Sequence, residues 1–127
     1  MLLLDTNILI DVLRGEQDAL AWLQQQQQQQ QQGPAISVIT WIEGLVGCRG
    51  EETAAVETWL ACFPRFPLDD AIAREAVRLR QTRGLKVPDA IILATAVCHG
   101  LTLATRNVRD VPLDLGGVLH PYRLGDP

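Results

Sequence analysis

The sequence predicts an α/β fold, a single domain with a central parallel sheet of about four to five strands and helices on both faces. The first observation is that short apolar runs alternate with segments in which apolar residues recur at helical spacing. The second is that the first run, residues 2–4, consists of three leucines, as is typical of a buried strand. The third is size, because 127 residues with a hydrophobic share of 47% can form one domain with its own core.

The N-terminal segment is predicted to form one strand and two helices. After the strand at 2–4, apolar residues between 8 and 13 have helical spacing, and Gly15 ends that helix. A second helix begins near Glu16 and runs into nine consecutive glutamines, Gln24–Gln32. This tract either extends the helix, since glutamine is a fair helix former, or is disordered. It has no ionisable group and is assigned no chemistry.

The middle of the chain is predicted to continue the alternation of strands and helices. Residues 35–40 (AISVIT) form a second strand, and residues 40–48 (TWIEGLVGC) form a helix. Residues 51–62 give an amphipathic helix, and the segment 65–69 is a short extended piece.

The C-terminal part is predicted to complete the sheet. A helix over 69–83 ends at Gly84, and a helix over 88–100 is apolar nearly all round, so it should be central and buried. Residues 101–105 form a strand, and residues 116–120 are a candidate for one more.

The formal net charge of −4 gives no indication of the basic face that is typical of a nucleic-acid-binding protein. It does not exclude one, because a metal site brings its own acids and a few local arginines can bind phosphates. No segment resembles a signal peptide or a membrane span.

The three cysteines, Cys48, Cys62 and Cys98, are odd in number, widely spaced and without a C-x-x-C pair. They are predicted to be buried thiols in a reducing compartment, which places the protein in the cytoplasm. Cys98 and His99 could form a metal-ligand pair, but a helix end packed into the core is the favoured interpretation.

Acidic residues follow the predicted strands. Asp5 stands at the carboxyl end of the first strand, Glu43 lies one turn into the helix after the second, and Asp89 begins the apolar helix. The segment TRNVRD, 105–110, follows a later strand. In a parallel α/β sheet these places share one edge, where ligands bind.

Each of these residues also has a structural interpretation. Asp5 and Asp89 could stabilise helix N-termini, and Glu43 could complete a capping box with Thr40. Residues 105–107 could simply form a turn. Four unrelated capping or turn roles on the same edge of the sheet are a weaker explanation than one acidic site formed by these residues.

An acidic site of this kind requires a cation. Two carboxylates ~4 Å apart repel by roughly 4 kcal/mol at an intermediate dielectric. Oxygen ligands without histidine or cysteine favour Mg²⁺ or Mn²⁺ over zinc. A water activated by such an ion is a suitable nucleophile for a phosphodiester.

Three blocks in this order and spacing, LLLDTNILID, SVITWIEGLVG and VPDAIILATAVCHGLTLATRNVRD, resemble the PIN-domain ribonucleases, and most closely the VapC-type toxins. The resemblance covers residues 1–127 as one PIN-like domain, apart from the glutamine tract. It implies a metal-dependent endoribonuclease that acts as the toxin of a type II toxin–antitoxin system. The implied substrate is structured RNA, tRNA or rRNA, cut by a metal-activated water.

The resemblance also implies a homodimer, a VapB-type antitoxin whose peptide lies over the active-site groove, and no membrane association. Asp5, Glu43 and Asp89 are the implied catalytic carboxylates around Mg²⁺ or Mn²⁺. The family's fourth acidic position falls on Asn107, which carries no charge, and this puts a second metal in doubt. Asp110 could take over part of that role.

Four further residues surround the implied site. Thr6 and Thr105 would support it through hydrogen bonds. Arg106 and Arg109 are candidates for phosphate contact, with solvated loop charges as the alternative.

Other classes of protein fit less well. A dehalogenase-like phosphatase needs an aspartate where Asn7 stands, and a receiver domain needs a lysine after a late strand, whereas Lys86 precedes a helix. The alternative function is a catalytically inactive PIN-fold protein that binds an antitoxin in a DNA-binding regulatory complex.

Overall fold

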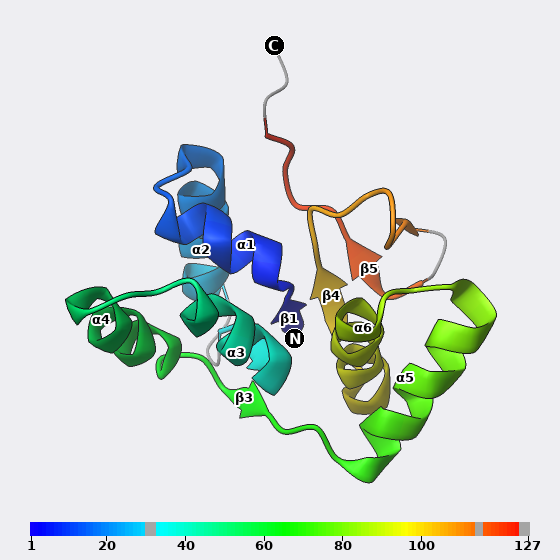
Figure 1. The fold of residues 1–127 in the computed structure, drawn as a ribbon. Helices are drawn as coiled ribbons and strands as arrows, with labels where there is room; N and C mark the ends of the chain where they lie inside the picture. Colours follow the sequence, from blue (N-terminus) through cyan, green and yellow to red (C-terminus); the bar gives the residue numbers. More distant parts are fainter. Residues whose placement is uncertain (30–32, 114–115, 125–127) are drawn as a thin grey trace.

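The computed structural model describes residues 1–29, 33–113 and 116–124. These ranges form a parallel five-stranded sheet with strand order β3-β2-β1-β4-β5 and six helices, which confirms the predicted fold class (Figure 1). The elements in chain order are β1 (Leu2–Leu4), α1 (Thr6–Leu13), α2 (Gln17–Gln29), β2 (Ala35–Ser37), α3 (Val38–Val46), α4 (Glu51–Leu60), β3 (Arg65–Phe66), α5 (Asp70–Arg83), α6 (Val87–His99), β4 (Thr102–Ala104) and β5 (Val118–Leu119). None of the helices in these ranges is long and apolar enough to cross a membrane.

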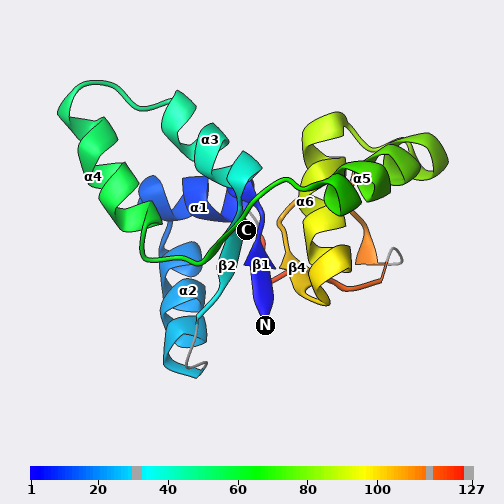
Figure 2. The same ribbon diagram turned by 90° about the horizontal axis from the view of Figure 1, so that it is seen from below.

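The sheet separates two hydrophobic layers, because side chains alternate between its faces along each strand. Leu3 of β1 lies opposite Leu103 of β4 and Ala35 of β2, and all three pack against α5 and α6. Leu4 and its neighbours on the strands pack on the other face against α1, α2 and α4. Figure 2 shows these two helical layers on opposite sides of the strands.

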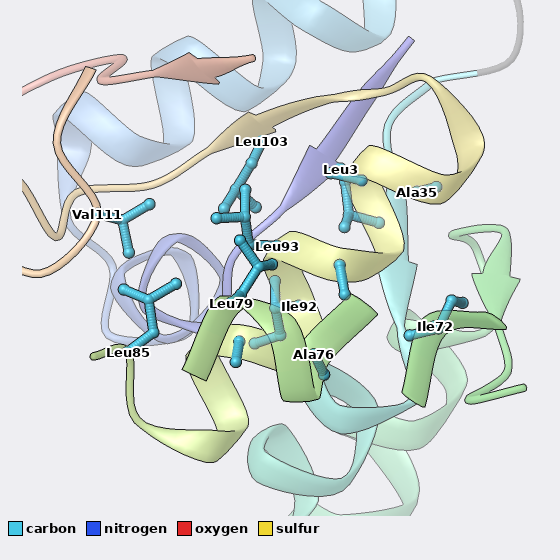
Figure 3. Close-up of a cluster of buried hydrophobic side chains, with 13 residues drawn as sticks. Leu3, Ala35, Ile72, Ala76, Leu79, Leu85, Ile92, Leu93, Leu103 and Val111 are labelled. Carbon is cyan, nitrogen blue, oxygen red and sulfur yellow. The ribbon is translucent and has the colours of Figure 1, made fainter. Parts of the chain in front are cut away.

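The layer formed by α5 and α6 contains the larger buried cluster (Figure 3). Ile72, Ala76 and Leu79 recur at helical spacing along α5 and are buried. Ile92 and Leu93 of α6 are 1% and 3% exposed. The carboxylate of Asp69 caps α5 by accepting the N–H of Ile72 at 2.9 Å.

The predicted second strand is wrong at its carboxyl end. It ends at Ser37, and residues 38–40 belong to α3. The Ser37 hydroxyl accepts the N–H of Ile39 at 3.0 Å and caps the helix there, which overrides the strand preference of the β-branched residues that follow. The proposed capping box of Thr40 and Glu43 is therefore also wrong, because Thr40 lies inside the helix.

The prediction that all three cysteines are buried is also wrong. Cys48 is half-buried, whereas Cys62 and Cys98 are exposed. The end of α6 is exposed from Val97 onward, so this helix is buried over its middle and not all round. The ring of His99 packs against Phe66 of β3 with centroids 4.2 Å apart.

The remaining predicted elements agree with the structure. The strand expected within residues 116–120 is β5, which pairs with β4. The glutamine tract extends α2 as far as Gln29, and its residues 30–32 lie outside the described residues.

Truncating the core at its central strand should destabilise the fold. Leu3 is fully buried between β2, β4 and α6, so Leu3→Ala is expected to lower the free energy of unfolding by about 2–5 kcal/mol. Urea unfolding followed by circular dichroism measures this. Leu20→Ala, on an α2 position that is 42% exposed, is the matched control and should cost under about 1 kcal/mol. Equal losses in the two variants would contradict the assignment of the core.

Candidate functional site

The acidic site begins where β1 ends. The backbone N–H of Asp5 still pairs with the β4 carbonyl of Ala104 at 2.9 Å, and its side chain is only 4% exposed. One carboxylate oxygen, Oδ1, accepts the N–H of Thr6 at 2.8 Å, and Oδ2 accepts the hydroxyl of Thr105 at 2.7 Å. A carboxylate in this position is therefore buried but hydrogen-bonded, which compensates part of its desolvation.

Asn7 joins the start of α1 to the loop after β4. Its amide Nδ2 donates to the hydroxyl oxygen of Thr105 at 3.2 Å and to Asp5 Oδ2 at 3.4 Å. Its Oδ1 accepts the backbone N–H of Arg106 at 3.1 Å. Asn7 was not among the predicted site residues, although its place two residues after Asp5, at the end of a buried strand, was a signal for such a role.

Glu43 reaches the site from α3. The Thr6 hydroxyl donates to Glu43 Oε1 at 2.6 Å, and the hydroxyls of Thr6 and Thr40 lie 3.1 Å apart. The helix N-terminus that replaces the predicted strand end brings Glu43 to this place, since α3 starts at Val38, two residues earlier than expected. The structure thus connects Glu43 to the residue that follows Asp5.

Asp89 is positioned by α6, and Asp110 by the loop after β4. Asp89 is half-buried in the first turn of α6. Asp110 donates its backbone N–H to Asn107 Oδ1 at 3.2 Å, and Asn107 Nδ2 donates to Asp110 Oδ2 at 3.4 Å. Asn107 is thereby occupied in orienting Asp110.

The acids influence one another electrostatically. Burial, opposed by the hydrogen bonds from Thr105 and Thr6, raises the pKa of Asp5, and together with the charges of Asp89 and Glu43 it brings that pKa to about 6. The pKa of Asp89 is raised by burial, then by Asp110 and Glu43, while Lys86 acts in the opposite direction. Like charges that raise each other's pKa favour either protons or a cation.

The arrangement of the acidic side chains suits a metal ion bound partly through water molecules better than one coordinated directly by three side chains. Among residues 1–29, 33–113 and 116–124, no three His, Cys, Asp or Glu side chains are close enough to ligate one ion as they stand. Mg²⁺ keeps several waters and takes one or two carboxylates directly, so water-bridged binding is compatible with this arrangement. The acids therefore fit Mg²⁺ or Mn²⁺ by their chemistry and their mutual repulsion.

A buried ion pair beside the site was missed in the sequence. Asp11 on α1 is 1% exposed and accepts two hydrogen bonds from Arg106, at 2.6 Å from Nε and 3.0 Å from Nη2. The hydroxyl of Tyr122 donates to the same carboxylate at 2.8 Å, and burial and Asp11 raise the pKa of Tyr122. The available signal was an acid three residues after Ile8, on the apolar face of α1.

The two candidate phosphate-binding arginines differ in their surroundings. Arg106 is held by Asp11 and is not a freely solvated loop charge, which corrects that alternative. Arg109 is exposed. Both line a hollow of about 350 Å³ with Asn7, Asn107 and Val108.

The raised pKa of Asp5 predicts that the stability of the metal-free protein, measured with a chelator present, depends on pH. Between about pH 4 and pH 6 the folded carboxyl holds a proton that the unfolded one has lost, so this group makes the protein less stable as the pH rises. Compared with wild type, Asp5→Asn should gain up to about 3 kcal/mol in the free energy of unfolding from pH 4 to pH 7. Urea titrations at both pH values measure the difference. Asp18→Asn, in the first turn of α2 and exposed, is the control, and a pH-independent difference for Asp5→Asn would contradict the interpretation.

Comparisons with known proteins agree with the fold. The family model for the PIN domain matches residues 2–110. Ribonuclease VapC19 of Mycobacterium tuberculosis is 33% identical over 118 residues, covering 89% of this chain and 94% of that protein. Ribonuclease VapC10 of the same organism is 36% identical over 119 residues, covering 89% and 87%. A solved toxin–antitoxin complex from Klebsiella pneumoniae contains a chain that superimposes with a TM-score of 0.87 at 40% identity, covering 98% of this chain and 100% of that one. The chain belongs to the PIN-domain family, and over most of its length it is similar to the VapC ribonucleases.

Proposed function

We propose that this protein is the ribonuclease toxin of a toxin–antitoxin pair and that it hydrolyses RNA with Mg²⁺ or Mn²⁺. The observation that carries the proposal is the buried carboxylate of Asp5, whose pKa is raised to about 6 mainly by burial and in addition by the charges of Asp89 and Glu43. A buried acid destabilised by other acids is suited to a divalent cation. The similarity to the VapC ribonucleases supports RNA as the substrate.

Asp5, Asp89 and Glu43 are the proposed ligands, with Asp110 as a further carboxylate. A bound Mg²⁺ or Mn²⁺ would lower the pKa of a water and stabilise the charge that develops on the phosphate. Thr105 and Thr6 hold the carboxylates of Asp5 and Glu43 in place through their hydroxyls. With Asn107 in place of a fourth acid, the site has one negative charge fewer, which favours a single metal ion.

Arg109, together with the part of the Arg106 guanidinium that Asp11 does not engage, is proposed to contact the phosphate. Both side chains line the hollow that opens beside Asn7, so a phosphodiester there would lie next to the acids. Structured RNA, either tRNA or rRNA, remains the predicted target class.

The proposed partner is a VapB-type antitoxin. The similar chain from Klebsiella pneumoniae was solved in a toxin–antitoxin complex, which supports this assignment. A homodimer and a cytoplasmic location remain predictions. The alternative function, antitoxin binding without catalysis, is favoured only by Asn107 at the fourth acidic position.

Loss of the central carboxylate should abolish cleavage. We expect wild type to degrade total RNA with Mg²⁺ or Mn²⁺ and to stop when EDTA is added, because the acids alone supply no electrophile. Asp5→Ala and Asp89→Asn should reduce the rate to background, whereas Asp18→Asn should match wild type. Gel analysis of total RNA measures this. RNA decay that is equal in the Asp5→Ala and wild-type lanes, or absent from every lane, would contradict the nuclease proposal.

The hydroxyl of Thr105 should matter through Asp5. Thr105→Ala removes the 2.7 Å hydrogen bond to Asp5 Oδ2, and supporting groups of this kind are typically worth about 10–100-fold in metal affinity or activity. Thr105→Ser keeps the hydroxyl and should retain most activity. Initial rates over a Mn²⁺ titration separate the effect on metal affinity from the effect on turnover. Equal losses in the alanine and serine variants would assign Thr105 to packing instead.

A further inference from the structure

We propose that an RNA backbone crosses the carboxyl edge of the sheet along three adjoining hollows lined by five cationic side chains, with the acids beside the central hollow. We call this surface the basic track, and define it by Arg83, Lys86, Arg109, Arg106 and Arg123. The proposal rests on the proposed function, and it adds the path by which the substrate approaches the site.

The three hollows follow one another because they share lining residues. The central hollow, of about 350 Å³, contains Arg106 and Arg109. A second, of about 210 Å³, shares Arg109 and adds Arg83 and Lys86 from the turn between α5 and α6. A third, of about 330 Å³, shares Arg106 and adds Arg123. Cations thus continue on both sides of the central hollow.

Four cations of the basic track are exposed and form no salt bridge with any residue that the structure describes. They are Arg83, Lys86, Arg109 and Arg123. This contrasts with a nearby arginine on α5, because Arg78 pairs with Glu75.

The turn that carries two of these cations is held in shape. Arg80 Nη1 donates to the carbonyls of Gly84 and Leu85 at 3.2 and 3.0 Å. Gly84 has a φ of 71°, a conformation that glycine adopts at no steric cost. Arg83 and Lys86 therefore project from an ordered turn, which lowers the entropy cost of binding a ligand there.

The acidic site lies against the basic track. Asp110 and Lys86 both line the second hollow. Besides burial, the charge of Asp110 raises the pKa of Asp89, whereas the charge of Lys86 lowers it. Asn7 of the central hollow is hydrogen-bonded to Asp5. A chain of phosphates along the track would therefore pass the carboxylates at its middle.

The chemistry of the lining favours a phosphodiester backbone over bases. Five of the chain's eleven Lys and Arg residues gather here in a protein of net charge −4. Among the described residues, none of the side chains that line these three hollows is aromatic, so the lining offers cations for phosphates and no aromatic ring on which a base could stack. Binding along the track should therefore be insensitive to sequence and sensitive to salt.

The test measures RNA binding in the absence of cleavage. The full-length Asp5→Asn protein in EDTA is titrated with a fluorescent 12-nucleotide single-stranded RNA at several NaCl concentrations, and binding is followed by anisotropy. Adding Arg83→Gln and Lys86→Gln together should lower the slope of log K against log salt by about 1.4, since each cation lost from a single-strand site removes roughly 0.7. Adding Arg123→Gln alone should lower it by about 0.7. Arg74→Gln, an exposed α5 position outside the three hollows, is the matched control and should leave the slope unchanged.

A second readout uses the wild-type active site. RNA substrates are extended one nucleotide at a time on either side of a fixed cleavable step. Wild type should gain affinity when the added nucleotide reaches Arg83 and Lys86, whereas the double variant should not. The double variant should raise KM more for long substrates than for the shortest substrate.

The outcomes separate this proposal from the proposed function. Reduced slopes with no cleavage by any protein would refute the nuclease but support the basic track. Cleavage with unchanged slopes, or with slopes reduced equally by Arg74→Gln, would refute the track and leave the nuclease intact.

Discussion

The structure depends on one constraint, the burial of the Asp5 carboxylate at the end of an apolar strand. Three leucines place this charge at 4% exposure, where it would be costly without partners. The N–H of Thr6 and the hydroxyl of Thr105 supply them from two neighbouring strand ends. Parallel pairing of β1 with β4 brings these two segments together although 100 residues separate them. The same pairing that closes the core therefore builds the acidic site.

Local sequence patterns predicted what is determined by local chemistry. Apolar runs and acids at strand exits were sufficient for the sheet and for the shared edge, because both follow from periodicity and parallel topology. The boundary between β2 and α3 was mispredicted because Val38, Ile39 and Thr40 favour strands individually, whereas one capping hydroxyl at Ser37 starts a helix. Propensity is a weak prior when a cap competes with it.

Features that need long-range pairing were not predictable from the sequence. Asp11, Arg106 and Tyr122 form one buried cluster, yet Asp11 and Tyr122 are 111 positions apart and share no motif. Asp11 is buried only because Arg106 and Tyr122 satisfy both of its oxygens. This cluster connects α1 to the loop after β4 next to the link formed by Asn7, so two independent contacts hold the loop that carries Thr105.

Asn107 shows how a neutral residue changes the balance of an acidic site. Its amide oxygen accepts the backbone N–H of Asp110 and its amide nitrogen donates to the Asp110 carboxylate, so the negative charge that acts on Asp89 stands at position 110 and not at position 107. A carboxylate at position 107 would repel Asp110 and would offset the positive charge of Arg109 in the same hollow. The neutral amide adds no charge and orients Asp110 through hydrogen bonds. The acids thus lie beside hollows that are lined mainly by cations, and this separation of charge along one edge of the sheet is what the proposed binding of a metal ion and of RNA by an acidic chain requires.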